Sequence, residues 1–240
     1  MKERPIIFSA EMVKAILDGK KTMTRRVIKS NHDLSRYTHV DFDVDGDNKW
    51  ELARINDLKR TYTKIGNPYG NVGDRLWVRE KFNLFTFSED MESAYPLKNL
   101  CTADEWEDED AWGRIQKDII YAESEKAREF FKNDKFRSPL FMPRWVSRIL
   151  LEITDIRVER LQDISETDCE KEGFRFYPLS RICFKPSSTK HPSGHGSNNY
   201  KSIFGEYWDT LNAKNSYPWS SNPWVWVIEF KKVHNDKPSD

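Results

Sequence analysis

The chain of 240 residues carries 39 basic and 39 acidic side chains, so its net charge does not draw it toward nucleic acid or a membrane. Hydrophobic residues make up 38% and aromatic residues 13%, which is enough for a core and argues against general disorder. The longest strictly apolar run, Trp224 to Ile228, is far shorter than the roughly 20 residues of a membrane span. The first residues lack the extended apolar centre of a secretory signal. We expect one cytoplasmic domain with no membrane association.

Three widely spaced cysteines, Cys101, Cys169 and Cys183, form no Cys-x-x-Cys pair, so neither a disulfide framework nor a zinc ribbon is indicated. His191 and His195 have metal-like spacing near Cys183, but they lie in a Ser- and Gly-rich loop without a fourth ligand in register. A Gly-rich phosphate loop after a strand is also missing. We therefore expect neither a metal nor a cofactor.

The N-terminal segment predicts a strand, a helix and a second strand. Pro5 to Phe8 is apolar, Ser9 suits a helix N-cap, and the apolar residues after it have helical spacing. We expect the helix over 10–18, ending at Gly19. Thr22 to Lys29 is rich in β-branched and long side chains and is expected to be extended.

The middle of the chain predicts an insertion followed by a central strand. Residues 31–70 have weak periodicity and many turn formers, which indicates an insertion. Over 75–80 the side chains alternate between two faces, which is typical of a strand. One face carries Leu76, Val78 and Glu80, and the other carries Arg75, Trp77 and Arg79.

The C-terminal half alternates strands with short helices. Residues 147–160 alternate as a long strand with a break near Thr154-Asp155. Ser165 can cap a helix that Gly173 ends, and 174–199 reads as a loop. A helix over 200–214 and a strand over 224–233 follow. The pattern predicts an α+β, mainly β fold: a small mixed or closed sheet with insertions.

Charge is segregated most sharply at the beginning, where the first 36 residues hold nine basic and four acidic side chains. The densest part is the turn over 19–26, which contains Lys20, Lys21, Arg25 and Arg26. A basic turn beside hydroxyls can hold a phosphate or a polarised carbonyl. The alternative is a solvated turn whose lysines complement the helix C-terminus.

Five segments together resemble the ASCH domain, in the long version found in phages and prophages. They are Phe8 to Arg26, Val72 to Glu80, Val158 to Ser165, Glu170 to Gly173, and Trp224 to Phe230. The Gly-Lys-Lys-Thr turn together with the late Val-Ile-Glu-Phe strand is the most specific pair. The resemblance implies a PUA-like β-barrel over 1–240, with insertions at about 31–70, 82–140 and 174–199. It also implies a cleft beside the turn, in a fold whose relatives bind RNA or modified bases.

Some small ASCH proteins are N4-acetylcytidine amidohydrolases that use a lysine, a threonine and a glutamate. The resemblance carries these roles to Lys21, Thr24 and Glu172 and favours an enzyme. Lys21 would take the proton of Thr24, whose oxygen attacks the acetyl carbonyl, while Glu172 orients Lys21 or protonates the leaving amine. Because positions three apart on a strand point to opposite faces, we expect Lys21 in the turn before the strand. A non-catalytic RNA-binding module and a single-strand ribonuclease remain alternatives.

Substrate binding would need stacking surfaces and edge contacts, which aromatic side chains and arginines supply. The expected partner is RNA or a modified nucleoside of cytidine type. The candidate binding residues are Lys20, Arg25, Arg26, Trp77, Arg79, Arg144 and Trp145. For Trp77 the alternative is a core position, and for Arg79 an ion pair with Glu80.

Overall fold

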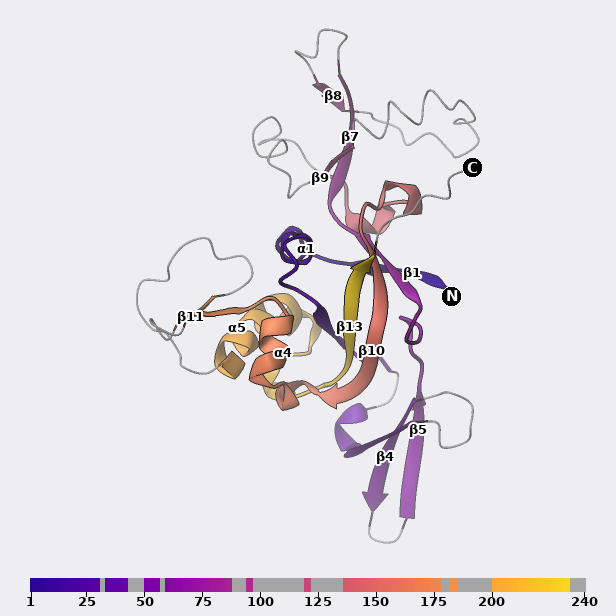
Figure 1. Ribbon diagram of the computed structural model, residues 1–240. Helices are drawn as coiled ribbons and strands as arrows, with labels where there is room; N and C mark the ends of the chain where they lie inside the picture. Colours follow the sequence, from indigo (N-terminus) through magenta and orange to yellow (C-terminus); the bar gives the residue numbers. More distant parts are fainter. Residues whose placement is uncertain are drawn as a thin grey trace.

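The computed structural model describes residues 1–30, 33–42, 50–56, 59–87, 94–96, 119–121, 136–177, 182–184 and 200–233. Within these residues the fold is α+β with mostly strands, as predicted (Figure 1). The central sheet has five strands in the order β1-β6-β10-β13-β2. Their bounds are β1 Glu3–Ile7, β2 Met23–Val27, β6 Arg75–Arg79, β10 Leu150–Arg160 and β13 Trp224–Val233.

The N-terminal helix α1, Ala10–Leu17, forms where the sequence predicts it. Ser9 caps it by accepting a hydrogen bond from the backbone N–H of Met12. Gly19 follows its C-terminal end with a φ of +70°, a conformation that costs glycine little. The N–H groups of Lys20 and Lys21 then both donate to the carbonyl of Ala15, at 2.8 and 3.1 Å. These bonds close the basic turn and lead the chain into β2.

The sheet is parallel only between β1 and β6, and every other pair in it is antiparallel. The long pair β10 and β13 forms its middle (Figure 1). Its register shifts between Ile153 and Asp155, which confirms the break predicted near Thr154-Asp155. The strand predicted over 224–233 is confirmed as β13, which has the same bounds.

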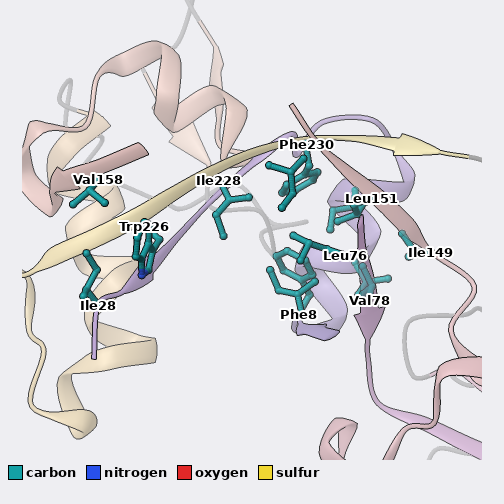
Figure 2. Close-up of a cluster of buried hydrophobic side chains, with 14 of the residues drawn as sticks. Phe8, Ile28, Leu76, Val78, Ile149, Leu151, Val158, Trp226, Ile228 and Phe230 are labelled. Carbon is teal, nitrogen blue, oxygen red and sulfur yellow. The ribbon is translucent and has the colours of Figure 1, made fainter. Parts of the chain in front are cut away.

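Two hydrophobic clusters cover opposite faces of β13. Trp224, Trp226, Ile228 and Phe230 lie in the larger cluster, as the alternation predicts, with Leu76, Val78, Leu151 and Phe8 (Figure 2). Val225 and Val227 lie in the second cluster, which the helices α4, Glu166–Lys171, and α5, Tyr200–Asn212, complete. A strand buried on both faces explains the nearly continuous apolar run of β13.

The segment predicted to be an insertion contains a sheet of its own. β3, His39–Phe42, β4, Trp50–Asn56, and β5, Lys59–Ile65, pair in sequence order as antiparallel strands. Leu52 and Ile65 pack into the larger cluster, and Trp50 meets Trp226 edge to face at a ring distance of 5.9 Å. Several residues of these strands are charged or turn-forming, so the periodicity of the segment is weak and does not predict the strands.

Two smaller sheets lie in the other segments that were predicted to be insertions. β7, Phe82–Phe87, pairs with β8, Ala94–Pro96, and with β9, Ile119–Tyr121. β11, Arg175–Tyr177, pairs with β12, Ile182–Phe184. The loop around His191 and His195 lies outside the described residues.

The two edges of the central sheet, β1 and β2, come close at one point. In the described part of the chain no backbone ladder joins them. Instead the guanidinium of Arg26 on β2 donates to the carbonyl oxygen of Ile7 on β1, at 2.6 Å. The described helices include none with the length and apolar character required to cross a membrane.

Candidate functional site

The basic turn and the end of α4 meet in a buried ion pair. Nζ of Lys21 lies 2.5 Å from Oε2 of Glu172 and 3.0 Å from the backbone oxygen of the same residue. The backbone N–H of Thr22 donates to the carbonyl of Lys171 at 2.8 Å, which ties the turn to α4. Glu172 caps the C-terminus of α4, and Gly173 follows with a φ of +98°. The turn and the helix end therefore hold the pair from both sides.

Burial sets the acid–base character of Lys21. Its side chain is only 1% exposed, and that of Glu172 is 6% exposed. Burial lowers the pKa of Lys21 below its usual value, more than the charge and hydrogen bond of Glu172 raise it. Arg26 and Arg25 lower the same pKa further. A lysine in this setting loses its proton more easily than one in water, as a general base must.

Arg25 is buried beside this pair and joins it to a second group of carboxylates. One of its nitrogens lies 2.6 Å from Asp168 and 3.2 Å from Glu159, and the other lies 3.7 Å from Oε1 of Glu172. Burial alone would raise the pKa of Asp168, but the hydrogen bond and charge of Arg25 and the charge of Arg157 lower it. Arg25 therefore works mainly as a fixed internal cation that orients carboxylates.

A cleft of about 800 Å³ opens beside these groups, between β2 and α5. Thr24, Arg25, Arg26 and Glu172 line it, so two of the three predicted catalytic residues share one wall. The other walls are rich in aromatic side chains. These are Tyr69, Phe204, Tyr207, Trp208 and Tyr217. The combination of charged groups with aromatic rings suits a flat, polar ligand.

Lys21 lies in the turn that precedes β2, because the strand begins at Met23. This is the arrangement that the spacing of Lys21 and Thr24 requires. Thr24 pairs with Ile228 in the ladder and is 2% exposed. Within the described contacts, its hydroxyl makes no hydrogen bond to Lys21 or Glu172. The lysine and the glutamate are thus joined directly, and the threonine shares the cleft with the glutamate.

Arg26 fixes the rim of the cleft. Besides its bond to Ile7, its guanidinium lies over the ring of Phe8, 4.9 Å from the centroid. Burial raises the pKa of Tyr69, and the charge of Arg26 opposes that rise. Arg25 and Arg26 are therefore the two predicted binding residues that line the cleft.

The remaining predicted binding residues lie elsewhere. Lys20 is exposed and pairs with Asp18. On β6, Arg79 stacks over the ring of Trp77, which is buried as the core alternative expects, 4.5 Å from its centroid. Glu80 pairs with Arg148 rather than with Arg79. Arg144 pairs with Glu3 at 2.7 Å. The cleft is lined by none of Trp77, Arg79, Arg144 and Trp145.

Sequence reasoning missed three residues at this site. Asp168 holds Arg25, but its place in the first turn of α4 signals only a favourable charge at a helix start. Tyr69 lies in a segment rich in turn formers, where nothing marks it. Tyr207 lies among the buried residues of α5, a pattern that by itself indicates only a core position. Among the described residues, no cluster of His, Cys, Asp and Glu is arranged to hold a metal ion.

Comparison with known proteins adds no relative from which a function could be transferred. No family model, no curated protein and no solved structure matches the chain. The residues of the site and their geometry are therefore the basis for any functional conclusion.

Proposed function

We propose that this protein is an ASCH-type hydrolase with a PUA-like barrel, which binds RNA or a modified cytidine and cleaves the acetamide of N4-acetylcytidine. One observation carries the proposal: a buried lysine is ion-paired to a glutamate that lines a cleft together with a threonine and aromatic rings. The resemblance of the Gly-Lys-Lys-Thr turn to that family supports the same reading. The bridge between Arg26 and Ile7 at the two sheet edges is compatible with a closed barrel.

The proposed reaction has two steps. Lys21, as the neutral amine, takes the proton of the Thr24 hydroxyl while its oxygen bonds to the acetyl carbon. The bond from that carbon to N4 then breaks, and the amino group of cytidine leaves with the proton. Water hydrolyses the resulting acetyl ester of Thr24, releasing acetate. The net reaction consumes one water molecule and needs no oxidant, reductant or metal.

The charges around the cleft fit these steps. The lowered pKa of Lys21 favours the neutral amine that the first step requires. Glu172 holds Nζ through its carboxylate and its backbone carbonyl, which leaves one of the three amine positions for Thr24. The contact between Thr24 and Lys21 would form when the ligand enters, as catalytic hydrogen bonds often tighten only in the complex.

Two substitutions of Thr24 test the proposal with little disturbance of the fold. Thr24→Val removes the hydroxyl and keeps the shape, whereas Thr24→Ser keeps the hydroxyl. We expect acetate release from N4-acetylcytidine to fall at least about a hundredfold in Thr24→Val and to persist in Thr24→Ser. Equal activity of Thr24→Val and the unchanged protein would refute the nucleophile. Binding without acetate release by the unchanged protein would indicate a recognition module, and shortened plain RNA would indicate a ribonuclease.

A further inference from the structure

The backbone of β2 has one paired edge and one free edge. On the paired edge, Ile28 donates to the carbonyl of Trp224 at 3.0 Å, and Phe230 donates to the carbonyl of Thr22 at 2.9 Å. These bonds extend the register in which Thr24 faces Ile228 and Arg26 faces Trp226. Successive residues of an antiparallel strand direct their N–H and C=O groups to opposite edges. The backbone groups of residues 23, 25 and 27 therefore point away from β13.

Part of this free edge opens into the cleft. Arg25 and Val27 both line it, and within the described residues no hydrogen bond reaches their backbone N–H or C=O groups from another element. Oε1 of Glu172, in a side chain that is 6% exposed, also has no hydrogen-bond partner. Buried polar groups are rarely left unpaired in proteins, so these groups point to a ligand that pairs with them.

The free edge is too short to receive a peptide strand. At its start, Met23 is fully buried in the cluster that α4 and α5 complete. Only Arg25 and Val27 remain open, whereas strand addition uses a longer run of main-chain bonds. One residue of a strand nevertheless offers a donor and an acceptor side by side. That pair matches the hydrogen-bonding edge of a planar heterocycle.

We propose that the free backbone edge of β2 at Arg25 and Val27 reads the donor–acceptor edge of a nucleobase. Phe204, Tyr207 and Trp208 of α5 supply aromatic surface on the other side of the cleft. Glu172 Oε1 accepts from the exocyclic amino group of the base. The class of ligand in this inference, a nucleobase, rests on the proposed function. The inference adds that main-chain groups of β2 determine which base is bound.

Amide hydrogen exchange measured by NMR tests the inference directly on the unchanged protein. The probes are the four ribonucleoside 5′-monophosphates, which carry no acetyl group. In the free protein we expect the N–H groups of Arg25 and Val27 to exchange faster than those of Thr24 and Arg26. A bound monophosphate should slow the first pair at least about tenfold and leave the second pair unchanged. A monophosphate that binds without slowing Arg25 or Val27 overturns the inference, as does failure of all four to bind.

A matched pair of variants provides the second test. Val27→Pro removes an N–H that the ladder does not use, which an edge strand tolerates, and Val27→Ala keeps that N–H while shortening the side chain. We expect Val27→Pro to weaken monophosphate binding about tenfold more than Val27→Ala does, because only the proline variant loses the N–H. Equal affinities overturn the inference. If Val27→Pro does not fold, the exchange experiment decides.

The two proposals fail in different ways. In one outcome, a monophosphate slows exchange at Arg25 and Val27, but the protein releases no acetate from N4-acetylcytidine. This result supports base recognition by the backbone of β2 and rejects the hydrolase. In the other outcome, acetate release depends on Thr24, but no monophosphate slows amide exchange in β2. This result supports the hydrolase and rejects base recognition by the backbone.

Discussion

Nζ of Lys21 lies 2.5 Å from Oε2 of Glu172, although 151 positions separate the two residues in the sequence. Both side chains are almost fully buried, so the tertiary structure brings a cation and an anion out of water together. The contact joins the turn after α1 to the C-terminal end of α4. It is the central relationship of the site, and its energy should be measurable apart from any activity.

Lys21→Met should destabilise the fold by roughly 3 to 5 kcal/mol, because it leaves the carboxylate of Glu172 buried with only a distant partner in Arg25. Glu172→Gln should cost less, since Lys21 can lose its proton and the amide oxygen can still accept a bond. The double variant should be more stable than the sum of the single effects implies. Urea unfolding of the unchanged protein, the two single variants and the double variant gives the coupling free energy between the two residues. Strictly additive losses of unfolding free energy would contradict a direct ion pair.

The stability of the fold should depend on Lys21 at alkaline pH. Burial holds the pKa of Lys21 below 10.5 in the folded state. Between that lowered pKa and 10.5, the unfolded chain binds more protons than the folded one, so the contribution of Lys21 to stability rises with pH. The contribution of Lys21 is the difference in unfolding free energy between the unchanged protein and Lys21→Met, measured by urea unfolding from pH 7 upward. A difference that shrinks as pH rises would mean that the charge of Glu172 outweighs burial.

Asp168→Asn should disturb the site through Arg25. The substitution removes the charge 2.6 Å from the buried guanidinium, which then depends on Glu159 and Glu172. We expect a loss of about 3 kcal/mol at neutral pH. Because the pKa of Asp168 is lowered, this contribution is present above pH 3.8 and is lost as pH falls through the lowered pKa. Unfolding curves of the variant and the unchanged protein should therefore converge in acid. A difference in unfolding free energy that does not change with pH would contradict the ion pair between Asp168 and Arg25.

Gly205→Ala tests the position of α5, which forms a wall of the cleft. A Cβ at this position would meet the ring of Trp219 at 3.0 Å, so the ring or the helix must move. We expect a loss of about 1 to 3 kcal/mol, although alanine favours helices more than glycine does. Ser202→Ala, at an exposed position of the same helix, is the control and should be neutral or slightly stabilising. A gain in stability from Gly205→Ala would place Trp219 away from α5.

Much of the local structure could be predicted from the sequence. The cap at Ser9 and the stop at Gly19 delimit α1, and the alternation of Trp224, Trp226, Ile228 and Phe230 assigns one face of β13 to the core. Lys21 stood out because charge is segregated in its turn. β3, β4 and β5 escaped notice because their pattern is irregular and short strands are recognisable mainly when they alternate cleanly.

The sequence alone determined the short-range features of this protein, because helix caps, glycine turns and side-chain alternation depend on neighbours a few residues apart. Only the tertiary structure decided that Glu172 meets Lys21, that Asp168 holds Arg25, and that Trp77 and Arg144 lie away from the cleft. It also decided which edge of β2 is free, since the pairing partner sets the direction of every backbone group. Such contacts join distant segments, and their burial sets the charge states on which a site depends.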